Sequence, residues 1–170
     1  TPAREAGRAP IRLGISEKAP LIAGLAIRRH RCEAVLCDLS LRPLRKEKLF
    51  FSDEMNPDRL LTCIYQLLDT LFYGHKNIAA IGVASIGPVS SSAGRILKPY
   101  YFYDIHDVEI VRLLSERYHM PVILDHDNQS AVLAEYYFGC GKDYQDILYV
   151  GVGTGVGSGV GSGVGVGIGS

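Results

Sequence analysis

Two carboxylates and an imidazole follow one another at Asp125, His126 and Asp127. They lie between a short apolar run, residues 122–124, and an apolar stripe at helical spacing over residues 128–138. This order predicts a buried strand followed by a helix. In an α/β sheet, ligands collect at the carboxyl end of such a strand, because the first helix amides and the loop side chains converge there. A carboxylate at that point can act as a general base toward a hydroxyl within hydrogen-bond reach.

A second interpretation of Asp127 is purely local. Aspartate is a common N-cap residue, whose side chain accepts a hydrogen bond from an amide of the first helical turn. From this stretch alone, both the base and the cap remain open.

Composition limits the classes to which the chain can belong. Its 170 residues are 47% hydrophobic and 21% charged, which suits one soluble globular core. The formal net charge is zero, so nothing in the chain indicates a nucleic-acid or membrane surface. No apolar run reaches the length of a membrane span, and no signal segment opens the chain. Because it begins at Thr1 rather than Met, we expect it to be part of a longer protein.

The four cysteines show neither a CxxC pair nor a histidine spacing that would suit zinc. We expect reduced thiols in a cytoplasmic protein, buried as small apolar residues, and no metal site. They are Cys32, Cys37, Cys63 and Cys140.

The first part of the chain divides into an arm and a strand meander. Residues 1–20 are rich in Pro, Ala and Arg without periodicity, which indicates a linker or arm. Two apolar runs, residues 21–27 and 32–39, flank the basic turn 28–31, and a third run lies near residues 49–51. This pattern predicts three antiparallel strands.

Strands and helices then alternate. Asn56 and the following proline open a helix that closes at Gly74. A nearly continuous apolar strand, residues 78–86, precedes a loop and a second helix around residues 108–118. We therefore expect an α/β domain over residues 21–142, with a mixed five-stranded sheet, helices on both faces, and the later strands parallel to the first.

The chain changes character at residue 143. A strand is predicted at residues 147–150, and glycine then occupies every second position from Gly151 to Gly169. This alternation excludes the GxGxxG dinucleotide fingerprint, and no Walker-type lysine is present. It places all glycines on one face of a strand, which is a weak and easily slipped arrangement. Residues 143–170 are interpreted as the start of a second domain followed by a low-complexity Gly/Val tail.

Three segments resemble landmarks of the ROK family, which comprises sugar kinases and sugar-responsive repressors on the actin-like (ribonuclease-H-like) ATPase fold. They read IGVASIGPV, then PVILDHDNQSAVLAEYYFGCG, then LYVGVGTGVGSGV. Their order and spacing agree with the family over residues 21–160. The resemblance implies an actin-like domain with a mixed five-stranded sheet and a second domain that is only begun.

The resemblance also implies functional residues. The family pattern E-N-D-x-N-x-x-x-L-x-E places Asp127 on the catalytic base, while His126 replaces an asparagine that touches a sugar hydroxyl. Gly87, His126 and Asp127 would line the sugar site. Gly153, Thr154 and Gly155 fall on the second phosphate loop, where backbone amides and a hydroxyl would cradle a phosphate.

Departures from the family pattern favour its repressor branch. The kinases carry D-x-G-G-T-K on the first hairpin, whereas this chain has Ala26 at the aspartate and residues 28–31, RRHR, in the remainder. The arginines could bind phosphates directly or form an ordinary basic surface turn. The segments GRAPIRLGISEKAP and FYDIHDVEIVRLL resemble repressor-type members. The zinc-binding Cys/His cluster of the family would lie beyond Gly155.

The preferred hypothesis is a fragment of a sugar-sensing transcriptional regulator whose kinase activity is lost. It would bind a sugar or sugar-phosphate effector, contact DNA through a domain outside this chain, form a homo-oligomer when full length, and not engage membranes. The alternative is a glucokinase-like, ATP-dependent sugar kinase that uses ATP and magnesium, with Asp127 as base and Thr154 near the phosphates. A third possibility is a truncated reading frame that binds nothing well.

Overall fold

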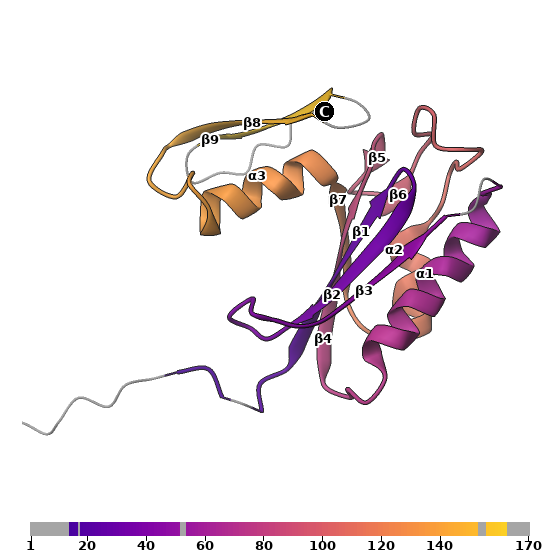
Figure 1. Ribbon diagram of the computed structural model, residues 1–170, viewed down its shortest axis with the longest axis horizontal. Coiled ribbons are helices and arrows are strands. Elements are labelled where there is room, and N and C mark those ends of the chain that lie inside the picture. Colours follow the sequence, from indigo (N-terminus) through magenta and orange to yellow (C-terminus); the bar gives the residue numbers. More distant parts are fainter. Residues whose placement is uncertain (1–13, 17, 52–53, 153–155, 163–170) are drawn as a thin grey trace, which may run out of the picture.

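The computed structural model describes residues 14–16, 18–51, 54–152 and 156–162. At its centre is a five-stranded sheet in the order β3-β2-β1-β4-β7 (Figure 1). The meander β1 (Leu21–Arg28), β2 (Arg31–Cys37) and β3 (Pro43–Phe50) is antiparallel. β4 (Ile78–Ser85) runs parallel to β1, and β7 (Val122–His126) runs parallel to β4. The predicted mixed sheet is confirmed.

Two helices cover one face of this sheet. α1 (Pro57–Phe72) starts at Asn56, whose side chain accepts from the Arg59 amide at 2.9 Å, and it packs against β2 and β3. α2 (Ile110–Tyr118) packs against β7 on the same side (Figure 1). Apolar side chains of both helices and of the sheet form the core between them. Among the fully buried ones are Leu25, Ile27, Leu36, Leu60, Ile64, Leu68, Leu71, Ile81 and Leu114.

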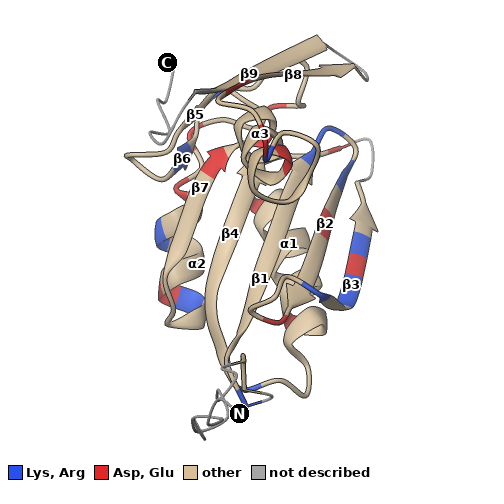
Figure 2. Ribbon diagram, turned by 90° about the vertical axis from the view of Figure 1, so that its left-hand side faces the viewer, with Lys and Arg blue, Asp and Glu red and all other residues tan. Residues whose placement is uncertain are grey.

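A third helix lies on the opposite face. α3 (Asp127–Phe138) begins where β7 ends and crosses only that end of the sheet, in front of it in Figure 2. Helices on both faces are therefore confirmed, but the remainder of the second face is open in the described part of the chain. Ile123, the second residue of β7, is 68% exposed there.

The segment between β4 and α2 forms a small hairpin and a loop. β5 (Val89–Ser90) pairs with β6 (Arg95–Ile96), and Ile96 also bridges to Val108. The loop between β6 and α2 buries Phe102 and Ile105 against the core. The expected helix at residues 108–118 begins two residues later, at Ile110.

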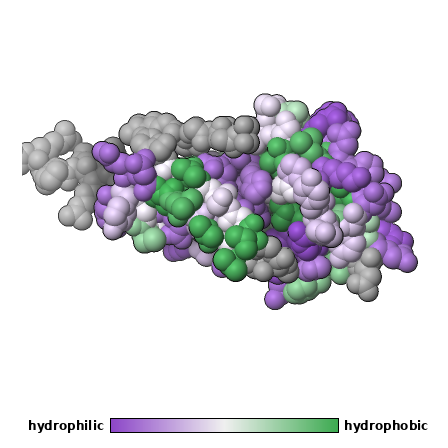
Figure 3. Space-filling view, turned by 90° about the horizontal axis from the view of Figure 1, so that it is seen from above, coloured by the Kyte–Doolittle hydropathy of each residue, from purple (hydrophilic) through white to green (hydrophobic). Residues whose placement is uncertain are grey.

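The glycine-rich segment has a packing role. β8 (Asp146–Val152) and β9 (Val156–Ser162) form an antiparallel hairpin that lies on α3. A Cβ on Gly159 would come within 2.6 Å of the Val132 side chain, and one on Gly157 would overlap Asn128. The glycine face expected from the alternation therefore lets α3 approach closely, while valines on the other face stay exposed (Figure 3). Residues 163–170 of the tail lie outside the described residues.

All four cysteines are unpaired: Cys32 is buried, Cys37 and Cys63 are half-buried, and Cys140 is exposed, contrary to the expected burial. Burial raises the pKa of the Cys32 thiol far above its usual range, with a smaller contribution from Cys63. None of the described helices is long and apolar enough to cross a membrane.

Candidate functional site

The carboxyl ends of β1, β4 and β7 meet at one edge of the sheet, because the three strands are parallel. Asp125 and His126 are the last two residues of β7 and pair with Ala84 and Ser85 of β4. The strand thus extends two residues beyond the predicted segment 122–124. Asp127 follows as the first residue of α3, the helix that lies at the end of β7 in Figure 2.

The N-cap of α3 is His126, not Asp127. The Asn128 amide donates to Nδ1 of His126 at 3.2 Å and to Oδ1 of Asp127 at 2.7 Å. Nδ1 of His126 lies 3.0 Å from Oδ1 of Asp127. Oδ2 of Asp127 makes no hydrogen bond within the described residues, so this oxygen is available to a ligand. Asp127 therefore uses one of its two oxygens within the first turn of α3, although it is not the cap.

The pKa of the His126 imidazole is raised above its ordinary value. The main cause is the hydrogen bond with Asp127, and the charges of Asp127 and Asp125 act in the same direction. Burial acts in the opposite direction, since it disfavours the charged ring. The contact with Asp127 therefore favours the charged form of the His126 ring.

Gly87 lies against the His126 ring. A Cβ on Gly87 would overlap the imidazole carbon Cδ2 and nitrogen Nε2. Only glycine leaves room for the ring at this position. The structure therefore brings together Gly87, His126 and Asp127, the three residues expected to line a sugar site.

A cavity of about 230 Å³ opens beside Asp127. Its polar and charged lining residues are Arg28 from the β1 end, Asp127, Asn128 and Ser130 from α3, and Tyr149 from β8. The small side chains of Ala26 and Ala84 also line it. The cavity thus lies between the end of β1, where the first hairpin turns, and Asp127, the proposed base.

Sequence reasoning missed Asn128, Ser130 and Tyr149. Ser130 could have been found, because it lies three residues after Asp127 on one helix face. Tyr149 comes from the β8–β9 hairpin, and no local sequence pattern predicts that it lies in the cavity beside Asp127. The predicted phosphate-binding residues Gly153, Thr154 and Gly155 lie outside the described residues.

The arginines of the first turn have partners within the chain. Nε of Arg28 lies 3.2 Å from Oε2 of Glu33, and Nε of Arg31 lies 2.8 Å from Oε1 of the same carboxylate. The hydrogen bond from Arg31, followed by the charges of both arginines, lowers the pKa of Glu33. Arg29 points elsewhere: its Nη1 donates to the carbonyl oxygens of Tyr100, at 2.7 Å, and Tyr101.

The described lining of this cavity is poor in acidic side chains. Asp127 is the only carboxylate among the described residues that line this cavity, and Ala26 offers no oxygen. A magnesium ion and a substrate hydroxyl would therefore compete for one side chain. Nor do the described residues contain a cluster of three His, Cys, Asp or Glu side chains that could hold a metal ion.

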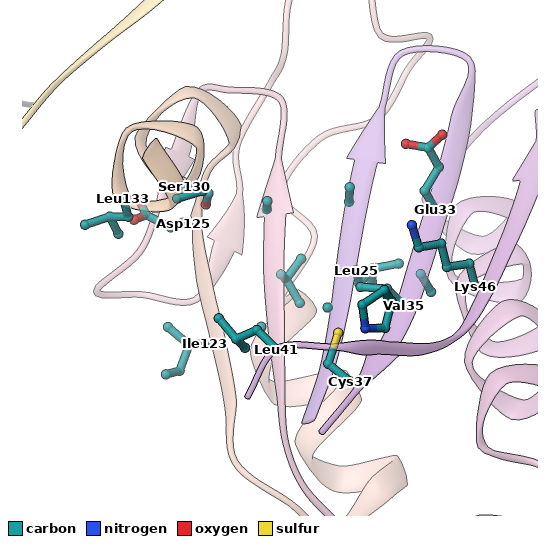
Figure 4. Close-up of a pocket in the computed structure, with 18 of the residues that line it drawn as sticks. Leu25, Glu33, Val35, Cys37, Leu41, Lys46, Ile123, Asp125, Ser130 and Leu133 are labelled. Carbon is teal, nitrogen blue, oxygen red and sulfur yellow. The ribbon is translucent and has the colours of Figure 1, made fainter. Parts of the chain in front are cut away.

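A larger groove, of about 1170 Å³, lies on the open face of the sheet (Figure 4). Its floor contains Gly24 of β1 beside Gly82 of β4, and its wall includes Ile123 and Leu133. Asp125 and Ser130 reach its edge from the site. The groove is mostly apolar, and its polar lining also includes Glu33, Lys46, Glu47 and Lys48 from β2 and β3.

Comparison with known proteins gives one family. A profile described as the ROK family matches residues 22–170. The N-acetylglucosamine repressor of Escherichia coli O157:H7 is 29% identical over 133 residues, which cover 76% of this chain and 32% of that protein. The xylose repressor of Bacillus subtilis (strain 168) is 24% identical over 155 residues, covering 87% of this chain and 39% of that protein. The chain thus spans about a third of the length of the relatives it matches.

Solved structures share the fold. A ROK family transcriptional regulator, described as a homologue of the E. coli Mlc protein, superposes with a TM-score of 0.74 at 21% identity, covering 84% of this chain and 36% of that one. A ROK family glucokinase from Streptomyces griseus, in complex with glucose and AMPPNP, gives 0.78 at 23% identity, covering 88% and 47%.

Proposed function

Because this chain belongs to the ROK family, we propose that it is the sugar-binding part of a transcriptional regulator in which the kinase activity is lost. Relatives named as repressors of N-acetylglucosamine and xylose systems support this proposal. In the full-length protein, a domain outside this chain binds DNA and the protein forms a homo-oligomer.

One observation carries the proposal: Ala26 and Arg28 line the same cavity as Asp127. In that cavity, the carboxylate expected of a kinase on the first hairpin is an alanine. Arg28 pairs with Glu33, and Arg29 is turned to the loop that carries Tyr100. Phosphoryl transfer depends on positioning and on stabilising the charge of the phosphates with a held metal ion. The described lining supplies neither.

The same cavity retains what a sugar requires. Oδ2 of Asp127 can accept a hydrogen bond from a hydroxyl, and a hydrogen bond to a charged acceptor is stronger than one between neutral groups. Asn128, Ser130 and Tyr149 add donors and acceptors around the rim. The sugar therefore binds through hydroxyl contacts at the end of β7 without being phosphorylated.

A sugar kinase is the second candidate. The fold shared with the Streptomyces griseus glucokinase and the position of Asp127 favour it. ATP and magnesium would then bind beside the first hairpin, where this chain offers no acidic side chain at residue 26.

A thermal-shift screen separates the candidates. A ligand that binds only the folded state stabilises it and raises the melting temperature. The stabilising free energy grows with the logarithm of the ratio of ligand concentration to Kd. We expect N-acetylglucosamine, xylose or glucose to raise it without ATP, and a coupled assay of ADP release to show no turnover with the same sugar. Turnover would contradict the regulator proposal and support the kinase. If no sugar raised the melting temperature, both candidate functions would be contradicted.

A further inference from the structure

The His126 ring faces two neighbours that make opposite demands on one nitrogen. The Asn128 amide donates to Nδ1 at 3.2 Å, which requires a lone pair on that nitrogen. Oδ1 of Asp127 lies 3.0 Å from the same Nδ1, which is favourable when a proton lies between the two atoms. A single ring position is therefore compatible with two protonation states.

Protonation of His126 alters the charge balance at Asp127 but not the hydrogen bonding at the start of α3. In the charged state, Nδ1–H donates to Oδ1, which still accepts from the Asn128 amide at 2.7 Å. The amide is satisfied in either state, so α3 keeps its first hydrogen bond. The carboxylate, however, is compensated by the imidazolium in one state and is uncompensated in the other. An uncompensated carboxylate is the stronger acceptor for a hydroxyl at Oδ2.

Among the described residues, the charged groups that act on the ring come from two elements. β7 contributes Asp125, whose Oδ1 accepts from the His126 amide at 2.8 Å and lies 3.4 Å from Oγ of Ser91. α3 contributes Asp127. The turn after β4 places Gly87, which has no charged side chain, against the ring. Both carboxylates raise the pKa of His126, and partial burial opposes them.

We infer that His126 is a positioning residue that competes with the sugar for Asp127, so that sugar binding releases a proton and weakens as His126 becomes charged. This inference rests on the proposed function. Two effects act in the same direction. A hydroxyl that binds Oδ2 reduces the negative potential at the ring, and a sugar in the cavity removes water from the imidazolium.

The direction of the pH dependence follows from linkage. Both effects lower the pKa of His126 in the sugar-bound state relative to the ligand-free state. Affinity is therefore complete above the ligand-free pKa, falls as the pH drops through that value, and levels off below the bound-state pKa. An asparagine at this position could not couple the site to pH in this way.

The first arm of the test needs no ligand. NMR titration of the imidazoles measures the pKa of His126 in the wild-type chain and in Asp127→Asn. The value should fall in the variant, because the ring loses the charged partner that raises its pKa. An unchanged pKa of His126 would overturn the inference, because the two side chains would not be coupled.

The second arm measures protons and affinity together. Calorimetric titration of the chain with N-acetylglucosamine and with xylose, in two buffers of different ionisation enthalpy, gives the number of protons released. We expect release of a fraction of one proton at the pKa measured for His126 in the first arm. The affinity should be about three- to tenfold weaker well below that pKa than well above it, the scale of one altered hydrogen bond. In His126→Asn both effects should vanish, and asparagine preserves the N-cap.

The outcomes distinguish this inference from the proposed function. Sugar binding with the same pH profile in the wild type and in His126→Asn, or without proton release, would overturn the inference and leave the proposed function intact. Failure of every sugar to bind at any pH would overturn the proposed function, and this inference with it, even if the first arm shows coupled side chains.

Discussion

Arg29 joins the β1–β2 turn to the loop before α2, with its Nη1 donating to the carbonyl oxygen of Tyr100 at 2.7 Å. The same nitrogen also donates to the carbonyl oxygen of Tyr101. Tyr101 adopts a positive φ of 53°, which is costly for a residue with a side chain. The guanidinium therefore holds a loop conformation that the backbone alone would not prefer.

Replacing Arg29 with alanine should lower the free energy of unfolding by about 1 kcal/mol, because two carbonyls lose a charged donor at a partly exposed site. Urea denaturation measures this change. Arg42→Ala is the matched control, since Arg42 pairs with Asp38 at the surface and is 75% exposed. Equal effects of the two substitutions would mean that the Arg29 contact contributes no more than an ordinary surface pair.

Gly87→Ala should destabilise the chain by about 1–3 kcal/mol, because the added methyl group overlaps the His126 ring. His126→Ala in the same chain should relieve most of this cost, which a double-mutant cycle measures. Gly82→Ala is the control, since its Cβ would meet nothing closer than the Ala23 carbonyl oxygen, at 3.9 Å. Additive effects at residues 87 and 126 would show that the ring does not rest on Gly87.

Gly159→Ala should loosen the β8–β9 hairpin from α3. The new methyl group would approach the Val132 side chain to 2.6 Å and the Asn128 carbonyl oxygen to 2.8 Å, and a backbone atom cannot move aside cheaply. Hydrogen exchange of the β9 amides should become faster. Val160→Ala, which alters an exposed neighbour, should leave exchange unchanged. Equal protection in both variants would show that the glycine face does not carry the packing.

Much of the fold was predictable because its signals are local and repeated. The apolar spacing of α1 between Asn56 and Gly74, and the apolar run of β4, each specify one element. The gathering of Gly87, His126 and Asp127 was predictable from the family pattern. The N-cap role of His126 was not, because histidine is an uncommon cap and the assignment depends on one ring orientation. The partners of Arg29 and the position of Tyr149 arise from contacts far apart in sequence, which no local pattern encodes.

Phosphoryl transfer should be absent. With ATP, magnesium and common hexoses, amino sugars or xylose, a coupled assay should show no ADP release, because Ala26 supplies no oxygen at the first hairpin. Ala26→Asp is an informative companion: restoring one carboxylate should not restore turnover, since Arg28 and Arg29 still occupy the turn. Turnover of roughly 1–100 per second by the unchanged chain would identify a kinase.

Calorimetric titration of sugar into the wild-type chain and into Asp127→Ala tests the central claim most directly. We predict that the substitution weakens binding by about 1–3 kcal/mol, the cost of leaving a polar partner in the cavity unpaired. The melting temperature should change little, because His126 remains the N-cap of α3. Asp58→Ala, which removes a first-turn carboxylate from α1, should leave binding unchanged. Unchanged sugar affinity in Asp127→Ala together with a lower melting temperature would contradict the account, because Asp127 would then serve the helix and not the ligand.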